Sequence, residues 1–269
     1  EKRIGYSDEW MIMSEPYRLW AIETSSPTTE ALLSFAAADN SVIIAPDISV
    51  YRELKLRLLN GTHTFSCGLA ILLGFKTVRE AMADHSFRSF VKKLMLKEIA
   101  PAISGSNINI KEAEAYAMSV IDRFSNPFID HAWINICLQY SSKMKMRNMP
   151  LLQALAEKNE GIPEHMALGM AAYILFMKSV KTADNQYQGN LQGTNYTIHD
   201  DSAVLLHEYW QAGSTEQVVR KVLSSDKLWG THHAMPPGFE DSVIRYLGII
   251  SSKDYLTVLD KFEPANTHP

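Results

Sequence analysis

The chain has 269 residues, of which 46% are hydrophobic and 21% charged, and its formal net charge is −4. These values are typical of a soluble globular protein, and they argue against a general nucleic-acid binder, which normally presents a basic face. The longest uncharged apolar run, residues 166–177, is too short to span a bilayer and indicates a buried helix. No nucleic-acid or membrane partner is therefore expected.

Two cysteines, Cys67 and Cys137, both lie in apolar runs. Buried thiols are the expected interpretation, rather than a disulfide, and they are consistent with a reducing cytoplasm. No CxxC pattern or other Cys/His spacing indicates a metal site.

Residues 1–46 differ from the rest of the chain. The short runs WMIMSEPYRLWAIE and SVIIAP are apolar, β-leaning and bounded by Pro and Ser. The chain starts at EKRIGYSDEW without an initiator Met or a signal-peptide pattern. We therefore expect residues 1–46 to be the end of a preceding α/β domain and residues 47–269 to form a second, helical domain.

Apolar residues recur at three-to-four spacing after Pro46, which predicts a mainly α fold. Thr77 with Glu80 has the pattern of a capping box, and Pro163 stands where a first turn begins. The stretch TADNQYQGNLQGTNYTIHD, residues 182–200, interrupts the series and is expected to be an exposed insert. The predicted helices cover residues 78–103, 110–124, 130–147, 149–158, 163–180, 200–213, 215–225 and 237–250.

The stretch LKLRLLNGTHTF, residues 54–65, allows two interpretations. Alternating Leu, Lys and Arg followed by Asn60-Gly61 is a strong signal for a β-hairpin. A series of apolar residues seven apart instead predicts one continuous helix: Tyr51, Leu58, Phe65 and Leu72. The helix is favoured because the residues after Gly61 do not alternate. In such a helix Gly61 and Gly68 would let another backbone approach closely.

Lys55, Asn60 and His63 would project from that helix at about 0°, 140° and 80°. They lie within one half of the circumference, which permits convergence on one ligand without requiring it. Taken singly, an isolated Lys on a helix is usually a solvated charge, and an Asn before Gly usually lies in a turn. A lone His is usually a surface or core residue whose ring nitrogens are hydrogen-bonded. Spacing alone therefore favours a structural interpretation of all three.

The chain nevertheless resembles the long-chain mannitol dehydrogenase family of polyol and sugar-acid oxidoreductases. The resemblance rests on Lys-x4-Asn-x2-His within KLRLLNGTH, on the Gly-rich helix after it, and on TVREAMAD. It continues through EPYRLWAIE, VIIAPDI, DRFSNPFIDHAW and SSKMKMR, so it covers most of the chain. It implies a metal-independent, two-domain enzyme in which an N-terminal Rossmann domain binds NAD and a helical C-terminal domain supplies catalytic residues. Because the chain has no GxGxxG, it is expected to be the C-terminal half, with its own Rossmann domain upstream.

The resemblance assigns the catalytic roles to Lys55, Asn60 and His63. Lys55 would be the general acid/base, which requires its pKa to be lowered from about 10.4 by burial or by a neighbouring charge such as Arg57. Asn60 would donate a hydrogen bond to the oxygen on which charge develops, as in an oxyanion hole. His63 would orient the reacting oxygen or a neighbouring hydroxyl.

Within the family, EPYRLWAIE followed by ELKLRLLNGTHT is most similar to the members that interconvert altronate and tagaturonate with NAD. Fructuronate/mannonate and mannitol/fructose are the nearest alternative substrate pairs, and a helical scaffold without catalysis is the alternative of a different class.

A small sugar acid needs a cation for its carboxylate. Lys143 in SSKMKMR is the favoured candidate, although cations there also suit a helix C-terminus, and Tyr17 and Arg18 are weaker candidates. Mannitol enzymes have an Arg eight residues before this Lys, whereas this chain has Asn135, which speaks against mannitol.

Overall fold

The computed structural model describes residues 5–12, 17–159, 161–191, 193–211, 213–231, 233–252 and 258–259. The chain divides into two compact units, Glu1–Tyr51 and Arg52–Pro269. The domain boundary predicted after Pro46 stays a prediction. Each unit is described by itself.

The first unit contains two parallel strands joined through a helix. β1 (Trp20–Glu23) pairs with β2 (Val42–Ala45), and the connection carries α1 (Pro27–Leu32) and the 3-10 helix η1 (Ser34–Ala38). Parallel strands require such a crossover, and the β–α–β arrangement is the building block of α/β domains. The expected β-containing segment before the helical domain is confirmed.

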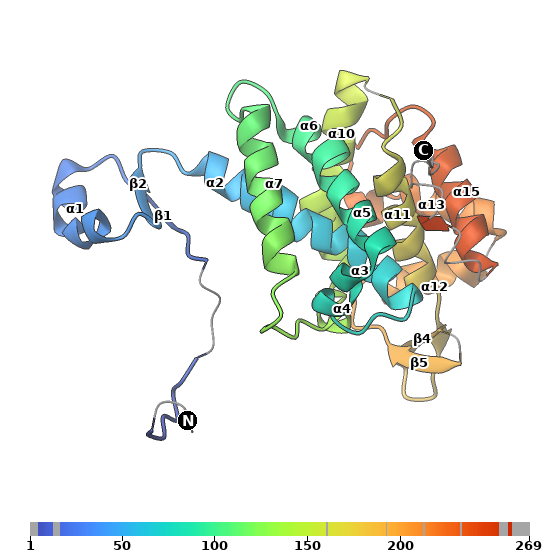
Figure 1. Ribbon diagram of the computed structural model, residues 1–269. Coiled ribbons are helices and arrows are strands. Elements are labelled where there is room, and N and C mark those ends of the chain that lie inside the picture. The colour runs from blue at the N-terminus through green and yellow to red at the C-terminus, as the bar shows by residue number, and fades with distance from the viewer. Residues whose placement is uncertain are drawn as a thin grey trace, which may run out of the picture. The chain divides into compact units, whose positions relative to one another are not determined.

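The second unit is a bundle of helices, which confirms the mainly α prediction (Figure 1). α11 (Glu164–Phe176) is its central helix, because residues 166–174 are all buried and α11 packs against both α3 and α15. The boundary between the two units falls within α2 (Ser49–Glu53). The other helices described in the second unit are η2 (Leu54–Gly61), α3 (Thr62–Leu72), α4 (Val78–Ala83), α5 (His85–Lys93), η3 (Leu94–Ile99), α6 (Ala100–Ile103), α7 (Ile110–Phe124), α8 (Trp133–Ile136), α9 (Tyr140–Lys143), η4 (Met144–Asn148), α10 (Met149–Lys158), α12 (Ala203–Gln211), α13 (Thr215–Leu223), α14 (Asp226–Trp229) and α15 (Phe239–Ser251).

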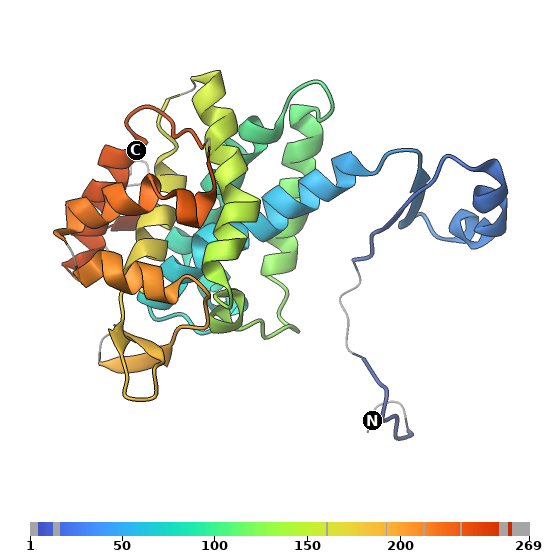
Figure 2. The same ribbon diagram turned by 180° about the vertical axis from the view of Figure 1, so that it is seen from behind.

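The stretch with two interpretations is helical. From Arg52 to Leu72 the end of α2, η2 and α3 form one continuous rod, so no hairpin turn occurs at Asn60-Gly61. Figure 2 shows this rod passing between α7 and the helix made of α9, η4 and α10, and it contacts both. Gly68 allows the close approach that was predicted, because a Cβ there would lie 3.1 Å from the carbonyl oxygen of Ala172 on α11.

Three of the described helical segments, η2, η3 and η4, are π-helical, with hydrogen bonds that span five residues instead of four. Pro101 follows η3 and Pro150 follows η4. A proline cannot donate to the carbonyl four residues before it, so a widened turn ahead of each proline relieves the mismatch. η2 is followed by no proline, so its widened turn needs another cause.

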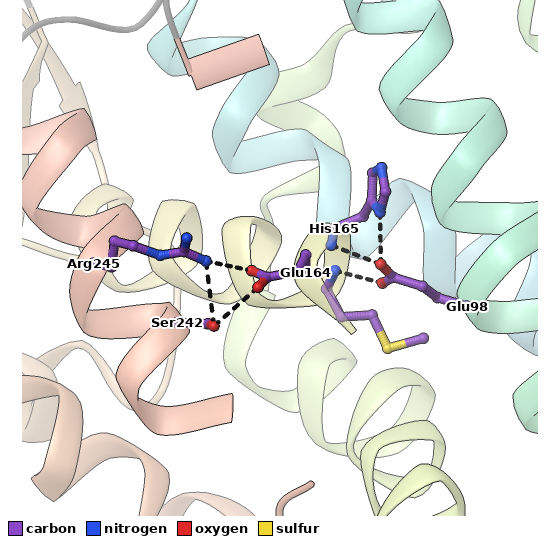
Figure 3. Close-up of polar contacts among 6 residues, drawn as sticks. Glu98, Glu164, His165, Ser242 and Arg245 are labelled. Atoms are coloured by element: carbon purple, nitrogen blue, oxygen red, sulfur yellow. Dashed lines mark hydrogen bonds and ion pairs between the residues drawn. The ribbon is translucent and has the colours of Figure 1, made fainter. Parts of the chain in front are cut away.

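Two carboxylates hold the N-terminus of α11 (Figure 3). Glu98, on η3, accepts hydrogen bonds from the backbone N–H groups of His165 and Met166, both at 2.8 Å. Glu164 accepts one from Arg245 on α15 at 2.6 Å. The first N–H groups of a helix have no partner within it, and a negative charge there is stabilised by the helix dipole. These contacts tie the central helix to its neighbours.

The helix predicted over residues 130–147 is wrong as a single element. α8 ends at Ile136 and α9 begins at Tyr140, and Gln139 between them has a φ of 52°, in the left-handed region. The Gln139 N–H donates to the carbonyl of His199 at 2.8 Å, and its side-chain amide donates to Asp201 at 3.0 Å. Contacts from about 60 residues away therefore hold the break, while the apolar spacing continues across it.

Two other predictions concern local features. The capping box of Thr77 and Glu80 is confirmed at the start of α4. The predicted insert, residues 182–200, contains β4 (Tyr187–Leu191) and β5 (Thr194–Thr197), which form a small antiparallel sheet with β3 (Val180–Lys181) just before it. The helix predicted to reach residue 180 instead ends at Phe176. Half of the described residues of the insert are exposed, and only Gly189 and Ile198 are buried. The Tyr196 hydroxyl anchors the sheet by donating to the Phe176 carbonyl at 2.6 Å.

Candidate functional site

Lys55, Asn60 and His63 all project from the rod, and the π-helical turn alters their relative directions. In an α-helix Lys55 and Asn60 would point about 140° apart. Both lie in η2, where hydrogen bonds span five residues, and such a wider turn reduces the angle between residues 55 and 60. Lys55 is exposed, Asn60 is half-buried and His63 is buried. The turn therefore favours a common side for Lys55 and Asn60, and His63 follows at the start of α3.

His63 lies in a box of aromatic rings. Its imidazole stacks on Phe124, the last residue of α7, with ring centroids 4.0 Å apart and planes 4° apart. His131 and Trp133 meet it edge-on at 5.5 and 5.8 Å. Nε2 of His63 is buried and has no hydrogen-bond partner in the described part of the chain. An unsatisfied buried nitrogen is uncommon and is often found where a ligand or catalytic partner acts.

Several positive charges surround this ring. Burial lowers the pKa of His63 well below its usual value, and repulsion between its protonated form and the charged forms of four neighbours lowers it further: His131, Arg147, Arg123 and Lys143. His63 is therefore neutral at pH 7, so one ring nitrogen donates and the other accepts. Because the charge of Lys143 acts on His63, these two candidate residues lie within electrostatic range of each other.

Lys143 has the environment that was expected around Lys55. It is half-buried, and its Nζ donates to the Ile136 carbonyl at 2.9 Å. Burial, and then the charge of Arg147, lower the pKa of Lys143. Lys55 itself is exposed. Arg57, which was expected to act on Lys55 through its charge, is buried, and its guanidinium donates to the Glu53 carboxylate at 2.9 Å.

The two weaker candidates lie in the first unit. Arg18 is exposed and forms an ion pair with Asp39, with 2.8 Å between Nη1 and Oδ2. Tyr17 is half-buried and directly precedes it. Both stay predictions as substrate contacts, as do the roles of Lys55, Asn60, His63 and Lys143.

Two residues whose rings lie against His63 were not predicted from the sequence. Nothing in the sequence singled out His131, a lone His in a loop, or Phe124, whose spacing only marks the apolar face of α7. The two cysteines are confirmed as buried free thiols. Burial raises the pKa of Cys137 well above its ordinary value, which disfavours its thiolate.

The part of the chain that the structure describes also contains a cavity away from His63. A cavity of about 400 Å³ at the far end of α3 from His63 is lined in part by Leu72, Tyr196 and Trp210. Within the described ranges, no three His, Cys, Asp or Glu side chains are grouped to hold a metal ion. None of the helices described has both the length and the apolar character needed to cross a membrane.

Acidification should destabilise the chain through His63. The unfolded chain titrates near pH 6.5 at this residue, whereas burial lowers the pKa in the folded state. Below about pH 6.5 the unfolded state therefore binds a proton that the folded state does not. Stabilisation that is complete above that pH is lost as the pH falls toward the lowered pKa, by at most about 1.4 kcal/mol per pH unit.

Urea unfolding at pH 7 and pH 5.5, on the chain and on His63→Gln, checks this prediction. The variant should lose less stability on acidification than the unsubstituted chain. An equal loss in both proteins would contradict a folded-state pKa lowered at His63.

The family model described as "Mannitol dehydrogenase C-terminal domain" matches residues 47–244. Among curated proteins, the chain is 32% identical to altronate oxidoreductase of Bacillus subtilis (strain 168) over 263 residues, covering 96% of this chain and 50% of that protein. It is 33% identical to altronate oxidoreductase of Halalkalibacterium halodurans over 259 residues, covering 94% and 50%. The chain thus spans about half the length of these relatives.

Two solved structures share the fold. The ternary complex of Pseudomonas fluorescens mannitol 2-dehydrogenase with NAD and D-mannitol matches with a TM-score of 0.72 and 25% identity, covering 92% of this chain and 46% of that one. Substrate-free D-sorbitol dehydrogenase matches with a TM-score of 0.58 and 20% identity, covering 81% and 42%. The second likeness supports the fold alone.

Proposed function

Because the chain belongs to the mannitol dehydrogenase C-terminal domain family, we propose that it is the catalytic half of an NAD-dependent oxidoreductase that interconverts altronate and tagaturonate. Its similarity to altronate oxidoreductases of two organisms supports the substrate, and the presence of NAD in the mannitol 2-dehydrogenase complex supports the cofactor. The observation that carries the proposal is the presence of Lys55, Asn60 and His63 on one rod beside a group of cations.

Oxidation of a secondary alcohol removes a hydride and a proton, and the proton needs a base. Lys55 is proposed as that base, and in the reducing direction its ammonium form protonates the developing alkoxide. A general base must be uncharged when it acts, and burial disfavours the charged form of a lysine. We therefore expect the nucleotide-binding domain of the complete enzyme to cover Lys55 and supply the burial that this chain does not.

Asn60 is proposed to donate an amide hydrogen to the reacting oxygen as negative charge develops on it. Neutral His63 is proposed to fix the orientation of a substrate hydroxyl, with its ring plane set by Phe124. Lys143 is proposed to attract the carboxylate of the sugar acid, together with the positive charge of Arg147. A cationic environment is what a hexonate requires and an uncharged polyol does not.

The residues of this chain do not fit the role of holding NAD. Between β1 and α1 of the first unit lie Thr24, Ser25 and Ser26, and α1 is only six residues long. A pyrophosphate normally sits against glycines at such a turn, where the backbone can approach closely. Cofactor binding is therefore assigned to an N-terminal Rossmann domain of the complete protein, and the 269-residue chain alone should bind NAD poorly in calorimetry.

The proposal is tested with the complete protein, nucleotide-binding domain included. NADH formation should be fastest with altronate, slower with mannonate, and slowest with mannitol. Activity confined to mannonate or mannitol would show that this compound, and not altronate, is the substrate. Inactivity toward all three would favour the alternative of a non-catalytic helical scaffold. Tight stoichiometric NAD binding by the 269-residue chain would contradict the assignment of the cofactor to the other domain.

A further inference from the structure

The π-helical turn η2 and the π-helical turn η4 are hydrogen-bonded to each other in both directions. In one direction, Arg57 of η2 donates from Nη1 to the carbonyls of Met146 and Arg147 on η4, at 2.8 and 2.7 Å. Met146 lies four residues before Pro150, which has no N–H to offer its carbonyl. Arg57 thus supplies the donor that the proline withholds, and Glu53 holds Arg57 in place.

In the other direction, η4 donates to the end of η2. Asn148, which is fully buried, donates from Nδ2 to the Gly61 carbonyl at 3.3 Å. Nη1 of Arg147 lies 3.5 Å from the Asn60 carbonyl oxygen and donates to the Thr64 hydroxyl at 3.2 Å. That hydroxyl in turn donates to the Asn60 carbonyl at 2.8 Å. The carbonyls of two successive residues at the end of η2 are therefore bound by side chains.

Gly61 makes this contact possible. A Cβ at position 61 would lie 3.1 Å from Oδ1 of Asn148, closer than most Cβ contacts in proteins. The glycine that suggested a hairpin turn in the sequence is thus the point at which Asn148 reaches the rod. No proline follows the widened turn of η2, and these side-chain hydrogen bonds meet the rod at the end of that turn.

We propose that Arg147 and Asn148 are positioning residues that hold η2 in its π-helical form. This inference rests on the proposed function, because the wider π-helical turn reduces the angle between the proposed catalytic residues Lys55 and Asn60. An α-helical turn would rotate the two side chains apart to about 140°. Neither Arg147 nor Asn148 needs to touch the substrate for its loss to slow the reaction, since a misplacement of about 1 Å can cost about 100-fold in rate.

The test uses Asn148→Ala and, as a milder change, Arg147→Lys, which keeps the positive charge near His63 and Lys143. In the complete enzyme, Asn148→Ala should lower kcat about 10- to 100-fold and Arg147→Lys about 10-fold, with KM changed less than twofold. Loss of kcat in proportion to a fall in folded protein, or a change confined to KM, would overturn the proposal.

A double-mutant cycle separates positioning from a general structural effect. Gly61→Ala pushes a methyl group against Asn148, so alone it should lower kcat about 10-fold. In the Asn148→Ala background the same substitution should cost less than threefold, because the group it displaces has gone. Independent, multiplicative losses would show that Asn148 does not act through Gly61.

Hydrogen exchange on the 269-residue chain gives a readout that does not depend on activity. Asn148→Ala should speed exchange of the amides of residues 60–65 at least 10-fold and leave those of α11 unchanged. If the complete protein proves inactive but exchange changes in this way, the proposed function fails while the structural role stands. Unchanged exchange in residues 60–65 would overturn the role of Asn148 whatever the activity.

Discussion

Replacing Lys55 by Met in the complete enzyme should lower kcat by roughly 10²- to 10⁴-fold, the usual contribution of a positioned general acid/base. Methionine keeps much of the length of the side chain but cannot accept or donate the proton. Because Lys55 is exposed, its replacement should change the free energy of unfolding of the 269-residue chain by no more than about 0.5 kcal/mol. The pH dependence of the remaining activity should also lose the limb that reports ionisation of the base.

Lys97→Met is the matched control for this prediction. Lys97 is also an exposed lysine in a π-helical segment, η3, and it has no proposed role in the site. Steady-state kinetics across pH 6 to pH 10 should show it to be indistinguishable from the unsubstituted enzyme. If Lys55→Met behaves like Lys97→Met, Lys55 is not the base, and the half-buried Lys143 becomes the amine to test next.

Gly169→Ala should destabilise the chain by about 1–3 kcal/mol, the typical cost of adding a methylene to a closely packed core. A Cβ at position 169 on α11 would lie 2.7 Å from the backbone oxygen of Phe65 and 2.9 Å from its Cβ. Neither atom is at the end of a flexible side chain, so α11 and the rod must move apart. Phe65 is two residues from His63, so activity should fall as well.

Gly248→Ala serves as the control, because it should stabilise the chain whereas Gly169→Ala should destabilise it. Gly248 also lies within a helix, α15, but no atom lies within 4 Å of the Cβ it would gain. Alanine is favoured over glycine in a helix by about 1 kcal/mol, so this variant should be more stable by about that amount. Urea unfolding of both variants measures the two effects. Equal shifts of the midpoint would mean that the rod and α11 are not in close backbone contact.

The elements themselves could be predicted from local sequence in most places. Three-to-four apolar spacing marks the helices because each must bury one face, and the seven-residue series from Tyr51 to Leu72 marks the rod. The capping box of Thr77 and Glu80 is local chemistry, which a short sequence carries in full. Gly68 marks in the sequence a point where another backbone can come close, although only the folded chain brings Ala172 there. The same stretch carries the spacing of Lys55, Asn60 and His63, and with it the resemblance to the family.

Local sequence is therefore enough to indicate which residues become helical, which faces turn inward and which polar groups stand on the rod. The break at Gln139, the π-helical form of η2 and the neutral state of His63 arise only in the folded chain. Each of these depends on polar or aromatic partners about 60 to 90 residues away, such as His199, Asn148 and Phe124. Apolar periodicity records that a face is buried, but hydrogen bonds and charges depend on which groups meet there, and long-range packing settles that.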